Sequence, residues 1–181
     1  MDVQTAQDRV LDAAGSLFYA RGVHAVGMDD VRDAARVSLK RLYQLFPNKE
    51  TLVTAYLQRR DVWWRDRLAT HVAREPDARR RPLAVFDWMH GWFHEPDYRG
   101  CAWINCYGEL GATSEPVAAE ARTHKEGFRA FLRGLCADAG LAPETGDQLL
   151  LLAEGAIVTS ALTGDLDAAL TARAAAAKLV D

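Results

Sequence analysis

The spacing of apolar residues constrains the fold of this chain more than any other feature. Apolar side chains recur at intervals of three and four in window after window, whereas the apolar–polar alternation of a half-buried strand is nearly absent. Proline, glycine and aspartate separate these windows. The pattern predicts an all-α fold of about nine helices, most of them bounded by such residues.

Three short helices are expected in the N-terminal part. The first carries its apolar residues on one face, begins near Thr5 as a cap and stops at Gly22, which tolerates a left-handed backbone. The second covers Met28–Ala35 and the third Leu39–Phe46, with Ser38 as the expected cap of the third. So few residues separate these two helices that they must cross steeply, and this arrangement is a helix-turn-helix.

The third helix has an inward and an outward face. Leu42 and Phe46, four residues apart, are expected to anchor it, so Lys40, Tyr43 and Gln44 turn toward solvent. A basic cluster surrounds this outward face and consists of Arg32, Arg36, Lys40, Arg41 and Lys49. The net charge of the chain is −3, so any attraction to nucleic acid must come from this local cluster. A solvated basic face without a partner is the alternative.

The segment from Val31 to Leu52 resembles the N-terminal signature of tetracycline-repressor (TetR) family regulators, and the resemblance extends over residues 6–56. The matching positions are Val31, Ala35, Val37, Ser38, Leu42, Tyr43, Phe46, Lys49, Glu50 and Leu52. The chain departs from the family pattern at Arg32, where Ala is usual, and at Arg36, where Gly is usual. Further departures are Lys40 for a frequent Gly, Leu45 for His or Tyr, and Val26-Gly27 for Thr-Thr or Thr-Ser.

This resemblance implies a dimeric transcriptional repressor that a small-molecule ligand releases from its DNA operator. It implies a helix-turn-helix domain, residues 1–48, and a larger helical domain for ligand binding and dimerisation, residues 49–181. It implies that Tyr43 and Lys49 contact phosphates of double-stranded DNA, which agrees with their hydroxyl and ammonium groups. Lys40, Arg41 and Gln44 can read base edges. The predicted DNA-binding residues are Arg36, Ser38, Leu39, Lys40, Arg41, Tyr43, Gln44 and Lys49. The expected operator is pseudo-palindromic, because one short helix reads too few base pairs.

Downstream helices are expected at Lys49–Val72, with Asn48 as its cap, and at Leu83–His94, Cys101–Gly111, Pro116–Ala139, Glu144–Thr163 and Asp167–Val180. Aromatic rings and polar groups share faces on several of them, a composition that suits a pocket for a small aromatic or amphipathic organic ligand. The predicted ligand-binding residues are Trp63, Phe86, Met89, His90, Phe93, Trp103, Asn105, Tyr107, His124 and Phe128. An aromatic core with satisfied polar groups is the alternative.

A stripe of small residues on the Glu144–Thr163 helix allows another helix to approach closely. The predicted homodimer interface consists of Leu149, Leu152, Ala153, Ala156, Ser160 and Thr163. In the resembling family the last two helices pair with those of a second copy as a four-helix bundle, which fits this position. Packing of the stripe against the chain's own Pro116–Ala139 helix is the alternative.

Other function classes have weaker support. His90 and His94 lie four apart with Asp87 three before them, which raises a metal-responsive regulator, and the three cysteines raise a redox-responsive one. We expect neither metal nor cofactor, and no enzyme, because phosphate-binding glycine loops and nucleophile elbows are absent. A ligand-independent or activating regulator remains open. A cytoplasmic protein without a membrane segment is expected, since no signal sequence is apparent.

Overall fold

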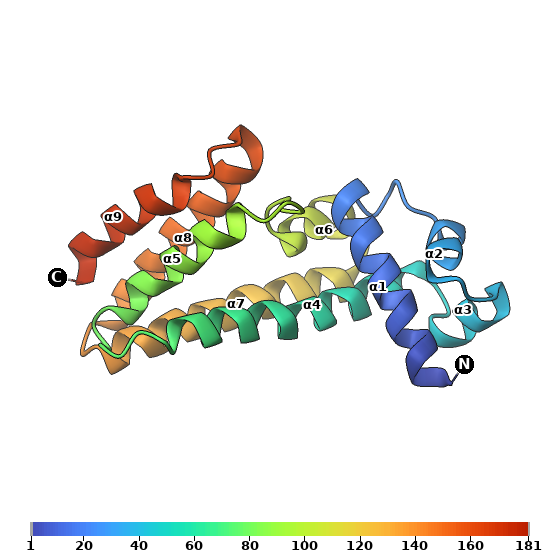
Figure 1. The fold of residues 1–181 in the computed structure, drawn as a ribbon, viewed down its shortest axis with the longest axis horizontal. Helices are drawn as coiled ribbons and strands as arrows, with labels where there is room; N and C mark the ends of the chain where they lie inside the picture. The colour runs from blue at the N-terminus through green and yellow to red at the C-terminus, as the bar shows by residue number, and fades with distance from the viewer. Residues whose placement is uncertain (1, 181) are drawn as a thin grey trace. The chain divides into compact units, whose positions relative to one another are not determined.

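The structure is a computed structural model that describes residues 2–180, and every regular element in that range is an α-helix (Figure 1). The helices of this range are α1 (Val3–Arg21), α2 (Met28–Ala35), α3 (Leu39–Leu45), α4 (Lys49–Val72), α5 (Arg81–Phe93), α6 (Ala102–Leu110), α7 (Glu115–Asp138), α8 (Pro143–Thr163) and α9 (Ala168–Val180). The predicted all-α class is confirmed, and the predicted bounds differ from those observed by at most three residues at the helix ends. Within the described range, no helix combines the length and apolarity needed to cross a bilayer.

The helices pack into two compact units, which are described separately. The first unit contains the residues up to Val62 together with Ala102–Arg122, and the second contains Trp63–Cys101 and the residues from Thr123 onward. The helices α4 and α7 therefore each begin in the first unit and end in the second. The functional boundary expected at residue 48 stays a prediction, since packing joins α6 and the start of α4 to the N-terminal helices.

The first unit is built around α1, α2 and α3, which contact one another pairwise. Val10, Leu42 and Leu52 are fully buried in its core. The cap of its first helix lies three residues earlier than expected, because the carboxylate of Asp2 accepts a hydrogen bond from the Thr5 N–H at 2.8 Å. Asp2, and not Thr5, is therefore the cap of α1.

A carboxylate of α6 fixes the turn between α1 and α2. Glu109 Oε1 accepts from the Val23 N–H at 2.9 Å, and Oε2 accepts from the His24 N–H at 2.6 Å. The turn starts at Gly22, whose φ of +84° is readily available only to glycine. The chain that leads into α2 is thus held by a side chain distant in sequence.

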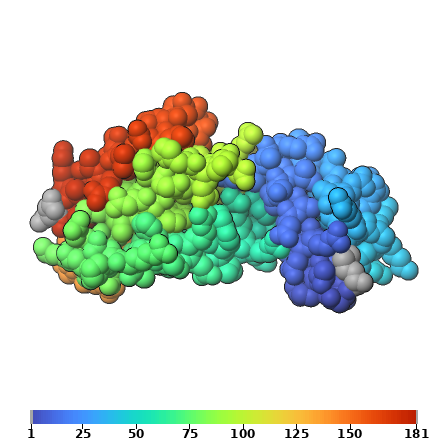
Figure 2. Space-filling view, in the orientation of Figure 1, coloured from blue at the N-terminus to red at the C-terminus, as the bar shows by residue number. Residues whose placement is uncertain are grey.

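The second unit contains α5, α8 and α9, and the space-filling view shows α9 lying against α5 (Figure 2). Its aromatic core surrounds Trp64, whose ring lies 5.0–5.1 Å from the rings of Trp88, His124 and Phe128. Edge-to-face contacts at such distances add stability beyond the buried area. Lys125 of α7 also forms an ion pair with Glu154 of α8 at 2.6 Å.

Candidate nucleic-acid interface

The helices α2 and α3 are anchored by buried apolar side chains. Val31 of α2 and Leu42 of α3 are fully buried, and Phe46 directly after α3 is 3% exposed. The Ser38 hydroxyl accepts from the Arg41 N–H at 3.2 Å, so Ser38 caps α3 as predicted. The orientation of α3 is therefore fixed by its own core contacts.

The opposite face of α3 points to solvent. Lys40 and Gln44 are exposed, and Leu39 and Tyr43 are each 44% exposed. Arg41 is half-buried at the flank of this face. The structure thus brings the predicted base-reading residues onto one exposed surface, with Arg36 and Ser38 exposed just before the helix.

Lys49 lies at the start of the next helix, where phosphates are favoured. It is the first residue of α4 and is half-buried. Asn48 precedes it, and its Oδ1 accepts from the Thr51 N–H at 2.8 Å, which confirms the expected cap. The free N–H groups and the dipole of such a helix end attract anions, and the ammonium group of Lys49 adds a full positive charge.

The basic cluster is smaller than the sequence indicates. Arg32 donates to Asp29 at 2.6 Å and to Asp33 at 2.8 Å, and these two carboxylates offset its charge. In the part of the chain that the structure describes, no ion pair involves the four remaining cations, which are Arg36, Lys40, Arg41 and Lys49. The unbalanced positive charge therefore lies on and beside α3.

Arg36 has an unusual backbone conformation at the junction between α2 and α3. Its φ of 53° and ψ of 47° are left-handed, and among the described residues it alone combines a side chain with a positive φ. Its N–H group closes α2 by donating to carbonyls of the last turn. The family pattern has Gly here because this cap position requires a left-handed residue. Arg36 therefore adds a charge at the expense of backbone strain.

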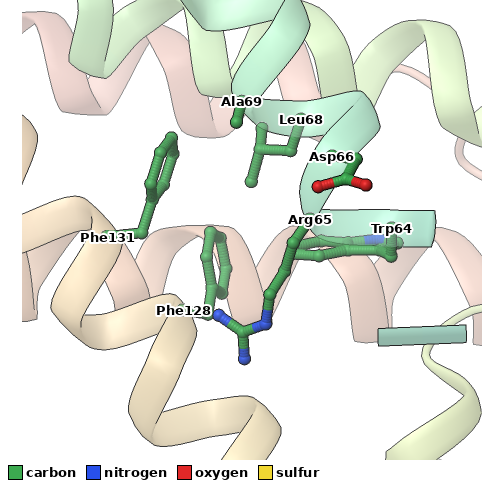
Figure 3. A pocket seen from close by; sticks show the side chains of 7 residues that line it. All are labelled: Trp64, Arg65, Asp66, Leu68, Ala69, Phe128 and Phe131. Carbon is green, nitrogen blue, oxygen red and sulfur yellow. The ribbon is translucent and has the colours of Figure 1, made fainter. Parts of the chain in front are cut away.

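The second unit contains a cavity of about 120 Å³ between α4 and α7 (Figure 3). It is lined by Trp64, Arg65, Asp66, Leu68, Ala69, Phe128 and Phe131. The Arg65 guanidinium lies over Gly127 and donates to the His124 carbonyl at 2.8 Å. Trp64 is 1% exposed, and within the described residues its indole N–H has no hydrogen-bond acceptor. The lining of the cavity is therefore mostly apolar, and the indole N–H of Trp64 is itself buried.

The predicted ligand-binding residues do not form one cluster. Phe86, Met89, Phe93, His124 and Phe128 are buried in the second unit, and of these only Phe128 lines the cavity. His90 is half-buried in the same unit. Trp103 is buried in the first unit, and Asn105 and Tyr107 are exposed there.

Trp63, one of the predicted ligand-binding residues, does not line the cavity, whereas its neighbour Trp64 does. Trp63 is 42% exposed with the Arg67 guanidinium 4.5 Å from its ring centre, whereas Trp64 is buried. The spacing of Leu57, Trp64 and Leu68 carries the signal, because all three lie on the buried face of α4 at intervals of seven and four.

Most of the predicted interface residues on α8 are already buried within one copy of the protein. Leu149, Ala153, Ala156 and Ser160 are at most 4% exposed, Leu152 is half-buried and Thr163 is exposed. Ser160 Oγ lies 2.6 Å from the Tyr98 hydroxyl of the same unit, so internal contacts occupy this face. The small side chains allow close packing within the chain.

Another face of α8 exposes apolar residues. Leu151, Val158 and Leu162 are 73%, 39% and 80% exposed, and their spacing of seven and four places them on one stripe. On α9, Leu170 and Leu179 are 41% and 37% exposed. The exposed apolar residues of α8 therefore lie on a different face of the helix from the predicted interface residues.

Comparison with known proteins identifies the N-terminal region. Residues 10–56 match the family model described as bacterial regulatory proteins, tetR family. An uncharacterized HTH-type transcriptional regulator of Mycobacterium tuberculosis is 43% identical over 56 residues, which are 31% of this chain and 28% of that protein. The HTH-type transcriptional activator FasR of Mycolicibacterium smegmatis is 49% identical over 51 residues, 28% of this chain and 23% of FasR.

Solved structures resemble this chain over nearly its whole length. A TetR-family transcriptional regulator from Streptomyces coelicolor superposes with a TM-score of 0.89 at 28% sequence identity. That superposition covers 98% of this chain and 95% of the other. The chain thus spans less than a third of the curated relatives in sequence, but nearly all of a solved relative in fold.

Proposed function

We propose that this chain, whose N-terminal domain belongs to the tetR family of bacterial regulatory proteins, regulates transcription by binding double-stranded DNA as a homodimer. The observation that carries the proposal is the exposed basic face of α3 above its buried anchor Leu42. A helix presented in this way fits the major groove, where side chains can distinguish all four base pairs.

The proposed DNA contacts are of two kinds, those to phosphates that position the protein and those to base edges that read the sequence. Tyr43 and Lys49 supply a hydroxyl and an ammonium for phosphate oxygens, and these contacts are independent of sequence. Lys40 and Gln44 extend from the exposed face of α3, where an ammonium suits guanine and a primary amide suits adenine. Arg36, just before α3, adds a cation beside the expected path of the backbone.

The DNA-binding test selects bound fragments from the source genome and then measures affinity against salt concentration. Lys40→Ala should relax the sequence preference, whereas Lys49→Ala should weaken all sequences alike and reduce the salt slope by about 0.9. Arg32→Gln is the matched control, because Asp29 and Asp33 already offset its charge. Full operator affinity in a Tyr43→Phe/Lys49→Ala double variant would overturn the assignment.

A second copy of this chain is the proposed partner of the α8–α9 surface. Exposed leucines on a soluble protein favour contact with a complementary surface, and a two-fold axis makes a surface complementary to itself. Two copies also place two recognition helices on one duplex, which a pseudo-palindromic operator requires.

Sedimentation velocity tests this interface. Leu151→Glu or Leu162→Glu should convert the dimer to a monomer and abolish operator binding, because each places a charge on the exposed stripe of α8. Val62→Glu is the control, since Val62 is 62% exposed on α4, outside the stripe. A dimer that persists in both leucine variants would refute the proposed interface.

A small organic ligand is proposed to control DNA affinity from the cavity beside Trp64. The support is the apolar lining of the cavity, which five of its seven residues provide: Trp64, Leu68, Ala69, Phe128 and Phe131. At about 120 Å³ the cavity is smaller than the 300–1,000 Å³ of usual ligand pockets. A drug-sized ligand must therefore move the half-buried Phe131, and this displacement couples binding to a change of conformation.

A fluorescence screen of aromatic fragments tests the ligand site. Trp64→Phe, which replaces the largest ring that lines the cavity by a smaller one, should lower fragment affinity about tenfold, which corresponds to about 1.4 kcal/mol. Trp63→Phe is the matched control, because that ring is 42% exposed on the same helix. Fragments that bind tightly without changing operator affinity would show that the cavity is not the switch.

Repression is the proposed mode, because a dimer on an operator excludes other proteins from that DNA. Activation is a second candidate, supported by the name of the related FasR, a transcriptional activator. A reporter under the selected operator distinguishes the two. Deletion of the gene raises reporter expression if the chain represses and lowers it if the chain activates.

A further inference from the structure

Two histidines of α5 and one aspartate before α9 bring metal-binding atoms together in the second unit. One ring nitrogen of His90, one of His94 and a carboxylate oxygen of Asp167 all lie within 4.8 Å of one another. We propose that these three side chains bind a divalent transition-metal ion such as Zn²⁺. The sequence points to His90 and His94 but not to Asp167, which is 77 residues from His90.

The separation of His90 and Asp167 fits shared coordination. Nε2 of His90 lies 3.0 Å from Oδ1 of Asp167. Zinc bonds to imidazole nitrogen and carboxylate oxygen are about 2.0–2.2 Å long, so neighbouring ligands in a tetrahedral site are about 3.3–3.6 Å apart. Small side-chain shifts therefore let a zinc ion replace the proton that these two atoms share. Two histidines and one carboxylate leave a fourth position for water, as in open zinc sites.

The ring of His94 is held in a tautomer that can bind metal. Its Nδ1 lies 2.8 Å from the carbonyl oxygen of His90. A carbonyl only accepts hydrogen bonds, so Nδ1 carries the proton and the lone pair is on Nε2. Hydrogen bonds of this kind orient metal-binding histidines and strengthen them as ligands.

The backbone holds the three residues in place before any ion binds. His90 and His94 are four residues apart and share a face of α5. The N–H of Asp167 donates to Asp165 Oδ1 at 3.0 Å, and its carbonyl accepts from the Leu170 N–H at 2.9 Å. Asp165 also adds a second negative charge to the turn. The site therefore needs little ordering of the main chain.

The third metal ligand in the structure differs from Asp87, the residue that the sequence indicates. Asp87 precedes His90 by three residues, but its carboxylate accepts from Arg173 of α9 at 2.6 Å. Asp167 reaches the histidines from the connection between α8 and α9 instead. A bound ion would thus tie α5 to the start of α9, which is one of the two helices proposed to dimerise.

The test uses protein without a histidine tag, dialysed against a chelator and titrated with Zn²⁺ in a calorimeter. We expect one ion per chain, and Zn²⁺ at a hundred times its Kd should raise Tm by about 5–10 °C. His94→Ala and Asp167→Asn should each weaken binding at least about tenfold. His71→Ala, which removes a histidine of α4 outside the site, should leave the affinity unchanged.

Titration with Co²⁺ identifies the ligand atoms. Ligand-field bands without thiolate charge-transfer absorption support nitrogen and oxygen ligands, whereas a thiolate band would assign the ion to a cysteine and overturn the proposal. Unsaturable Zn²⁺ binding, or equal affinity in the two site variants, would also overturn it. Circular dichroism checks that these variants fold. Operator affinity measured in chelator separates failure of DNA binding from failure of the metal site.

Discussion

Replacement of Arg36 by glycine separates backbone strain from charge at the junction of α2 and α3. Arg36 closes α2 with a φ of 53°, a left-handed conformation that glycine adopts without penalty. Its guanidinium also belongs to the unbalanced basic cluster beside α3. We therefore expect Arg36→Gly to make the protein more stable while it binds DNA less tightly.

The size of the stability change follows from two opposing terms. A residue with a Cβ in the left-handed region costs roughly 1–2 kcal/mol, and glycine avoids this strain. Glycine in turn costs roughly 0.5–1 kcal/mol through the greater entropy of the unfolded chain. The free energy of unfolding should therefore rise by about 0.5–1 kcal/mol, which corresponds to about 1–4 °C in Tm for a chain of this length.

Urea denaturation followed by circular dichroism measures this change, and Arg36→Ala provides the matched control. Alanine removes the charge but keeps a Cβ at the strained position, so the difference between the two variants isolates the backbone term. Both variants should lose operator affinity equally, with a salt slope lower by about 0.9 if Arg36 contacts one phosphate. A glycine variant no more stable than the alanine variant would refute the strain argument.

Three further outcomes are expected. Glu109→Gln should destabilise the chain by about 2 kcal/mol and speed hydrogen exchange at Val23, because one charged acceptor of the α1–α2 turn is lost. The hydrogen bond from Arg133 lowers the pKa of Asp147 below its ordinary value of 3.8, so this ion pair stabilises the fold fully above pH 3.8 and progressively less as the pH falls below it. Asp147→Asn should therefore reduce the fall of Tm with decreasing pH in this acidic range. Burial raises the pKa of the Cys136 thiol, so iodoacetamide should modify Cys136 only after unfolding, as mass spectrometry would show.

Local sequence rules predicted the helices and the recognition face. Caps such as Ser38 and Asn48 act within three residues, and the anchor Leu42 follows from the period of one helix. The exposed residues of α3 are therefore determined by the sequence of α3 itself. The assignment of these residues to individual DNA contacts stays a prediction.

Tertiary structure determined which face of each longer helix is buried. The small residues of α8 predict close packing but not its partner, and the structure places Ala156 against its own chain while Leu151 faces solvent. On α4 two adjacent tryptophans fit different apolar stripes, and the rings of α5 and α7 pack against Trp64. A helix period identifies residues that share a face, but the neighbouring helices decide which face is covered.

The polar contacts between residues distant in sequence could not be predicted from the sequence either. Glu109 reaches the turn after α1 across 86 residues, and Asp167 reaches His90 across 77. Hydrogen bonds and metal sites require atoms about 3 Å apart, and no periodic pattern encodes that distance between remote segments. The sequence alone determined the helices and the exposed chemistry of α3, whereas only the packed chain decided which distant side chains meet, because contact depends on the position of whole helices.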